Sequence, residues 1–202
     1  MPLGNTSRPM GFIPYNAAGR WNPIVVPRPI PLTRTGSGGG NASTDMAVGD
    51  AYGIDGSGNA FRAGPSDTVR GIIMSFVLQA TSLVMNGAGP VSFDYVTGTL
   101  AAVGLLIGCE DPEALFLVQA DTYAASNAGG KFNLADAAPD PLWRQSRQTI
   151  NIGGGAGTQF NTIDIPGGPG TAPPGVPTMG SPNNAYGANA KVLVRMLTTY
   201  NE

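Results

Sequence analysis

Glycine and proline interrupt this chain so often that its hydrophobic residues fall into short runs. The 30 glycines and 18 prolines together make up about a quarter of the 202 residues. Short hydrophobic runs bounded by Gly, Pro, Asn, Asp and Ser are typical of strands joined by turns. Because 42% of the residues are hydrophobic, wholesale disorder is excluded. The length fits one all-β sandwich or barrel, and we predict a single all-β domain with appended loops.

Several stretches carry strand patterns. A hairpin is predicted where 48–54 and 60–62 flank an Asp-Gly turn. The run 100–108 is almost wholly apolar, and we expect a strand there that is buried on both sides. The other predicted strands are 69–80, 91–97, 115–119, 150–152, 160–165 and 191–197. Before the last strand, residues 166–190 hold six prolines, six glycines and no charge, and we expect an irregular loop.

The chain contains no histidine, which narrows its possible chemistry. Ser-His-Asp and Cys-His catalysis, His general bases and most catalytic zinc sites are excluded. The single cysteine, Cys109, excludes an intrachain disulfide. Glu110 and Asp111 follow it, so no basic neighbour lowers its thiol pKa, and we predict a buried hydrophobic role for Cys109.

Two further patterns only superficially resemble functional sites. The segment 55–59 has the Asp-rich look of a calcium loop but lacks EF-hand spacing. The glycine loop 153–157 lacks the Gly-Lys-Ser/Thr ending of a phosphate-binding loop. A hydrolase that uses Asp111, Glu113 or Asp121 remains an alternative without a recognisable nucleophile and base. We therefore predict no catalytic residue, no cofactor and no metal.

The N-terminal 35 residues differ from the rest of the chain. Seven prolines there disfavour helices and central strands, yet large apolar residues lie between the prolines. We predict a docking arm over 1–35, a Gly/Ser hinge over 36–45 and a globular domain over 46–202. The alternative is that the arm wraps its own body. The predicted docking residues are Phe12, Tyr15, Arg20, Trp21, Ile24, Val25, Val26 and Arg28.

Charge divides the chain in the same way. The first 44 residues hold four arginines and no acid, whereas the remainder holds seven basic residues and thirteen acids. The arginines are too sparse for a nucleic-acid tail, and the acidic body would repel phosphate, so we expect a protein surface as partner. No apolar run reaches the length of a membrane span and no signal peptide is recognisable, so we expect a soluble, unsecreted protein.

Three places in the globular part carry a resemblance. They are 49–50 with the later Asp-Thr-Val-Arg-Gly-Ile of 67–72, the stretch 110–121 with 124–134, and the closing Val-Leu-Val-Arg of 192–195. On these patterns, residues 46–200 resemble the capsid decoration, or cement, proteins of tailed bacteriophages. The resemblance covers neither the arm nor the 166–190 loop.

The resemblance implies a β-barrel or jelly-roll-like domain without catalytic residues. It also implies a homotrimer that binds the major capsid protein on the outer surface of the virion, after synthesis in the host cytoplasm. A cement protein must contact two or more neighbouring capsomers, and an apolar, proline-stiffened arm supplies contact area at reduced ordering cost. The alternative is a virion fibre or glycan-binding module in which Tyr186 stacks on a sugar beside Asn183, Asn184 and Asn189.

Overall fold

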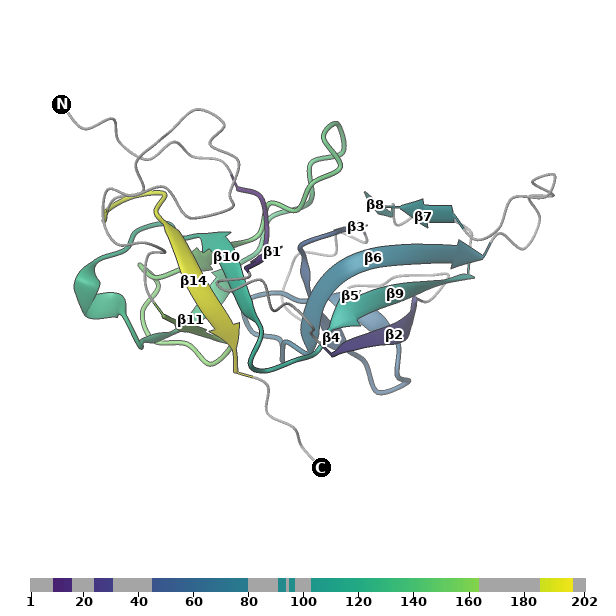
Figure 1. Ribbon diagram of the computed structural model, residues 1–202, viewed down its shortest axis with the longest axis horizontal. Helices are drawn as coiled ribbons and strands as arrows, with labels where there is room; N and C mark the ends of the chain where they lie inside the picture. The colour runs from purple at the N-terminus through teal and green to yellow at the C-terminus, as the bar shows by residue number, and fades with distance from the viewer. Residues whose placement is uncertain are drawn as a thin grey trace.

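The chain folds as a β-sandwich of two antiparallel sheets (Figure 1). The computed structural model describes residues 9–15, 24–30, 45–79, 91–93, 95–96, 103–163 and 186–197. Within these ranges the only helical element is a single 3-10 turn, Ala125–Asn127. None of the described residues forms a helix that is long and apolar enough to cross a membrane.

Sheet I lies on the left of Figure 1 and has six strands. After β10 the chain returns to sheet I through β11, β12, β13 and β14, and β10 pairs with β14 over five residues. A parallel bridge between Ala120 and Ile150 brings the β12 end of the sheet back beside the end of β10, so the sheet is strongly curled. In spatial order the strands are β1 (Ile13–Pro14), β10 (Leu115–Gln119), β14 (Lys191–Met196), β13 (Phe160–Thr162), β11 (Lys131–Ala135) and β12 (Thr149–Asn151).

Sheet II lies on the right of Figure 1 and is built around the long strand β6. β6 pairs with β9 along most of its length, and the register shifts between Ile73 and Ser75. The strands are β2 (Val25–Ile30), β9 (Val103–Cys109), β6 (Gly71–Gln79), β4 (Ala51–Ile54) and β5 (Ala60–Arg62), with β7 (Val91–Phe93) paired to β6. A separate two-stranded ladder joins β3 (Met46–Ala47) to β8 (Tyr95–Val96).

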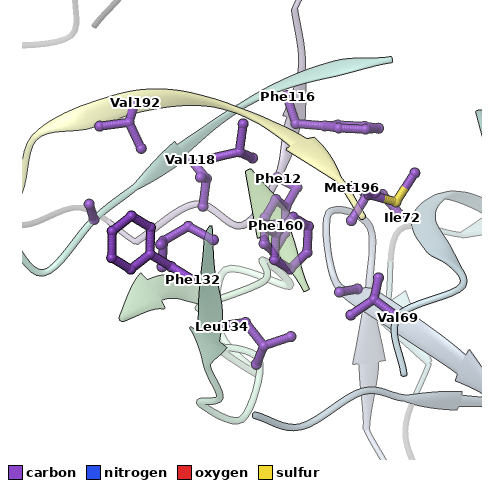
Figure 2. Close-up of a cluster of buried hydrophobic side chains, with 14 of the residues drawn as sticks. Phe12, Val69, Ile72, Phe116, Val118, Phe132, Leu134, Phe160, Val192 and Met196 are labelled. Carbon is purple, nitrogen blue, oxygen red and sulfur yellow. The ribbon is translucent and has the colours of Figure 1, made fainter. Parts of the chain in front are cut away.

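The main hydrophobic core lies where the two sheets meet (Figure 2). Sheet I contributes Phe116, Val192 and Phe160, and sheet II contributes Ile72. Phe12, just before β1, stacks on Phe160 with ring centroids 4.6 Å apart. A second cluster, which includes Phe76 and Leu106, lies within sheet II.

The predicted all-β class and the hairpin at 48–62 are confirmed. β4 pairs with β5, and the Asp55 carboxylate accepts the backbone N–H groups of Ser57 and Asn59 within the turn. The prediction of a strand buried on both sides at 100–108 is only partly right. Leu106 is fully buried, but Leu105 and Ile107 on the other face of β9 are partly exposed.

The two described parts of the predicted arm are strands at the margins of the sheets. β1 pairs with β10, and β2 pairs with β9 as the last strand of sheet II. The N–H of Glu110 donates to the carbonyl of Ile24, so the backbone N–H and carbonyl groups of every second residue from Ile24 onward point towards β9. Pro27 and Pro29 are not among these residues. The two prolines therefore sit where the backbone nitrogen points away from the sheet, which is where an edge strand tolerates them.

Candidate docking surface

The loop that joins β11 to β12, residues 136–148, projects beyond the sheets near β8 and is drawn in green in Figure 1. We call it the docking hairpin, and residues 140–145 its tip. Leu142 is 79% exposed and Trp143 is 72% exposed. Among the described residues these are the two most exposed large hydrophobic side chains, and they are adjacent in the chain.

The tip is ordered by its own turn. The Asp140 carboxylate accepts the backbone N–H groups of Leu142 at 2.9 Å and Trp143 at 3.0 Å. The Asp140 N–H donates to the carbonyl of Gln145 at 2.8 Å, which closes the turn. Arg144 has a φ of 53°, the left-handed conformation that such a turn requires. The exposed Leu-Trp pair is thus held in place by backbone hydrogen bonds.

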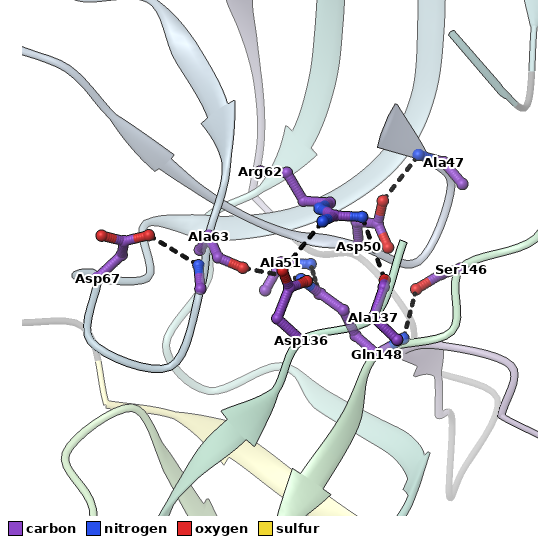
Figure 3. Close-up of polar contacts among 11 residues, drawn as sticks. Ala47, Asp50, Ala51, Arg62, Ala63, Asp67, Asp136, Ala137, Ser146 and Gln148 are labelled. Carbon is purple, nitrogen blue, oxygen red and sulfur yellow. Dashed lines mark hydrogen bonds and ion pairs between the residues drawn. The ribbon is translucent and has the colours of Figure 1, made fainter. Parts of the chain in front are cut away.

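The first end of the docking hairpin is anchored by a buried ion pair (Figure 3). Arg62 of β5 pairs with Asp136 at 2.9 Å, and both side chains are less than 5% exposed. A second guanidinium nitrogen of Arg62 donates to the carbonyl of Ala137 at 3.1 Å. Because β5 belongs to sheet II and Asp136 follows β11 of sheet I, the ion pair also joins the two sheets.

The second end is anchored by a buried glutamine. The Gln148 Oε1 accepts the backbone N–H of Ala51 at 2.6 Å. Its Nε2 donates to the carbonyl of Ala63 at 2.8 Å and to Asp136 at 3.2 Å. The polar atoms of the Gln148 side chain thus find their partners inside the protein, and the same buried polar cluster holds both ends of the docking hairpin.

Asp50 lies in the same cluster and is fully buried (Figure 3). One carboxyl oxygen accepts the N–H of Ala47 at 2.8 Å, and the other has no hydrogen-bond partner. Burial raises the pKa of Asp50 to about 7, although the neighbouring Ser146 hydroxyl, the Ala47 N–H and the charge of Arg62 oppose the rise. The neutral, protonated form of this carboxyl is therefore favoured over a wide range of acidic pH.

The predicted docking residue Phe12 has a different role from the one that we expected. It is 1% exposed and belongs to the core between the sheets, so it is not available to a partner. The physical reason is that stacking on Phe160, the first residue of β13, removes the Phe12 ring from water. Tyr15 is partly buried beside β10, where its N–H donates to the carbonyl of Leu115. Arg20 and Trp21 lie outside the described residues.

The remaining predicted docking residues belong to or adjoin β2. Ile24 is 60% exposed and Val25 is 50% exposed, whereas Val26 is partly buried. Arg28 is bound within the chain, because two of its guanidinium nitrogens donate to Glu110 at 2.5 and 2.6 Å.

Glu110 is a buried acceptor that holds β2 to the body. Tyr52 donates to its carboxylate at 2.8 Å and Arg70 at 3.0 Å, in addition to Arg28. Burial alone would raise the pKa of Glu110, but the hydrogen bonds from Arg28 and Tyr52 outweigh it and lower the pKa. Arg28 therefore holds β2 to the body of the protein, and its positive charge is already paired with Glu110.

The acids of the hydrolase alternative serve the fold. Asp111 accepts the N–H of Glu113, and Glu113 pairs with Arg195 at 3.2 Å on the surface. Asp121 accepts three backbone N–H groups, two of them from Ile152 and Gly153. In the part of the chain that the structure describes, no cluster of acids or cysteine has the composition of a metal site.

The glycan-binding alternative gains no support from the geometry. Tyr186 is 38% exposed and lies 6.1 Å from Tyr123, ring to ring. The Asn189 side-chain oxygen accepts a hydrogen bond from Gln119. Asn183 and Asn184 fall outside the described residues. Cys109, in contrast, is fully buried as predicted, and burial raises the pKa of its thiol.

Leu142 and Trp143 were not predicted from the sequence. The signal that could have found them is the string Asp-Pro-Leu-Trp-Arg at 140–144, in which two large apolar residues follow a turn-forming Asp-Pro pair. They belong to neither a strand pattern nor a helix pattern, and an arginine follows them. Apolar residues in such a turn have no regular element to pack them inward.

Comparisons with protein-family models, with curated proteins and with solved structures gave no significant match to this chain.

Proposed function

We propose that this chain is a non-enzymatic structural subunit, a cement protein that binds the outer surface of an assembled virus capsid at the junctions between capsomers. Its partner is the major capsid protein. The observation that carries the proposal is the adjacent pair Leu142 and Trp143, each more than 70% exposed on a hairpin whose two ends are anchored in a buried cluster. Binding through an ordered element costs less conformational entropy than binding through a loose one.

A second exposed apolar site supports a bridging role. Ile24 and Val25 lie at the start of β2 in sheet II, whereas the docking hairpin joins two strands of sheet I. In Figure 1 the hairpin projects above the sheets and β2 runs along the lower right. Two apolar sites on different sheets allow one molecule to contact two neighbours, which is what stabilising a shell requires.

The finer architecture is part of the same proposal. The bridge between Ala120 and Ile150 supports a barrel-like closure of sheet I, as in the β-barrel or jelly-roll-like domains that the resemblance implies. We further propose a homotrimer on the virion surface, because linked copies multiply weak contacts through effective concentration. Light scattering of the purified protein should give three times the monomer mass, and a monomer mass at micromolar concentration would contradict the trimer.

The test uses undecorated shells assembled from the major capsid protein of the virus that encodes this chain. The protein should co-sediment with shells at a saturating stoichiometry, and calorimetry should show that the decorated shells disrupt at a higher temperature. Unassembled capsid protein is the control, since a cement protein requires the junction. The cement function is wrong if the folded protein fails to sediment with shells, or if it binds without raising their disruption temperature.

A further inference from the structure

We infer that the tip of the docking hairpin inserts into an apolar socket with an acidic rim on a different protein. Leu142 and Trp143 would fill the socket, and Arg144 and Arg147 would pair with carboxylates around it. The inference rests on the proposed function, because it specifies the chemistry of the capsid surface that the hairpin meets. It does not depend on the trimer.

Most of the positive charges that the structure describes are bound within the chain. Arg28 and Arg70 pair with Glu110, Arg62 pairs with Asp136 and Arg195 pairs with Glu113. The Lys191 ammonium donates to Gln119. Within the described ranges, the basic side chains that lack any such bond are Lys131, Arg144 and Arg147, and all three are exposed.

Two of these three charges follow the exposed Leu-Trp pair in the chain, because Arg144 is the next residue and Arg147 lies three residues beyond it. The one acid of the tip, Asp140, already accepts two backbone N–H groups of the turn. The docking hairpin therefore presents an exposed apolar pair followed by two exposed arginines, Arg144 within the tip and Arg147 just after it. Trp and Arg are the residues most enriched at energetic centres of protein interfaces, and guanidinium groups match carboxylates in a two-pronged geometry.

The described carboxylates make a different protein a better partner for the tip than another copy of this chain. Each of the ten described carboxylates already accepts a hydrogen bond or ion pair within its own chain. Over these residues a second copy thus offers no carboxylate that is free of an intrachain bond, so forming the rim would compete with bonds already made. The acceptors are Asp45, Asp50, Asp55, Asp67, Glu110, Asp111, Glu113, Asp121, Asp136 and Asp140.

The tip is better suited to a protein surface than to a lipid surface. The tip exposes only two large apolar side chains, and a membrane-binding surface gains its strength from a large buried apolar area together with many basic residues. Two side chains fixed by a hydrogen-bonded turn are instead suited to a pocket of matching shape, where a single Trp can dominate the affinity.

The experiment measures binding of the full-length protein to undecorated shells by co-sedimentation over a range of salt concentrations. Trp143→Ala should weaken binding at least about tenfold. The double variant Arg144→Gln/Arg147→Gln should weaken binding about tenfold at low salt and flatten its salt dependence. Lys131→Gln is the matched control, because it removes another exposed positive charge, at the start of β11 and outside the docking hairpin, and it should bind within about twofold of wild type. Tyr186→Ala is the aromatic control.

A photo-crosslinking residue at position 142 gives an independent readout, and it should join the tip to a capsid segment that contains Asp or Glu. The inference is wrong, with the cement function intact, if wild type binds shells and Trp143→Ala binds equally well. It is also wrong if phosphatidylserine vesicles capture wild type but not Trp143→Ala, or if Trp143→Ala loses self-association in sedimentation velocity. If wild type itself fails to bind shells, the proposed function fails first.

Discussion

At the scale of single residues, Asp50 makes the stability of the protein depend on pH. Its folded-state pKa of about 7 lies above the ordinary value of 3.8, so the folded protein binds this proton more tightly than the unfolded chain. Stability from this group is complete below pH 3.8 and is lost as the pH rises towards 7. At about 1.4 kcal/mol per pKa unit, the loss is on the order of 4 kcal/mol.

Asp50→Asn imitates the protonated form and should remove most of this slope. Urea unfolding at pH 5 and pH 8 should show wild type less stable at the higher pH and the variant nearly unchanged. Glu110 acts in the opposite sense, because its lowered pKa gives stability that is lost on acidification, so both proteins should weaken at strongly acidic pH. An equal slope between pH 5 and pH 8 in both proteins would rule out Asp50 as its source.

Phe12 is the residue at which the N-terminal segment contributes most clearly to the core. Phe12→Ala removes a buried ring stacked on Phe160 and should lower the free energy of unfolding by about 3 to 5 kcal/mol. Tyr15→Ala, at a partly exposed position of the same segment, should cost clearly less. Thermal unfolding of the two variants measures the difference, and equal shifts would show that the stacking contact adds nothing.

At the scale of elements, the buried pair of Arg62 and Asp136 anchors the docking hairpin. Arg62→Met leaves a buried carboxylate without its partner and should cost about 3 to 5 kcal/mol, whereas Arg62→Met combined with Asp136→Leu should recover much of that loss. Arg195→Met breaks an exposed pair and should cost under about 1 kcal/mol. Urea unfolding of the three variants separates these cases. A double variant no more stable than Arg62→Met would show that the loss in Arg62→Met does not come from an unpaired Asp136.

The elements also show what sequence patterns can predict. The hairpin of β4 and β5 was predictable because its turn is local, and Asp55 binds its own neighbours within four residues. The pairing of β2 with β9 joins residues about 80 positions apart in the chain, and no local pattern specifies it. The prolines of β2 indicated an extended segment, but which edge it joins depends on Glu110, far along the chain.

The candidate site was less predictable than the fold. Phe12 and Trp143 are both aromatic residues in proline-containing segments, and only tertiary structure makes one buried and the other exposed. The absence of histidine did restrict the catalytic possibilities, and the acids Asp111, Glu113 and Asp121 turned out to be bound to backbone or to arginine. A charge that looks free in sequence is free only if the fold leaves it without a partner.

At the scale of the whole molecule, the two prolines of β2 determine how copies can meet. Pro27→Thr/Pro29→Thr restores two outward N–H groups to the last strand of sheet II. The fold should survive with an unchanged circular dichroism spectrum, but turbidity and thioflavin binding should appear at high concentration. Substitution of the exposed Pro65, in a turn outside the strands, is the control and should leave the protein clear. A double variant that also stays clear would show that the edge is protected by other means.

Those prolines matter most where the protein is most crowded. Under the proposed function, copies gathered on a shell would face one another at local concentrations far above those in free solution, and high concentration favours edge-to-edge pairing of strands. The prolines remove two of the donors that such growth requires at this edge. If the chain coats a shell as we propose, two pyrrolidine rings would therefore oppose strand pairing between neighbouring copies through this edge.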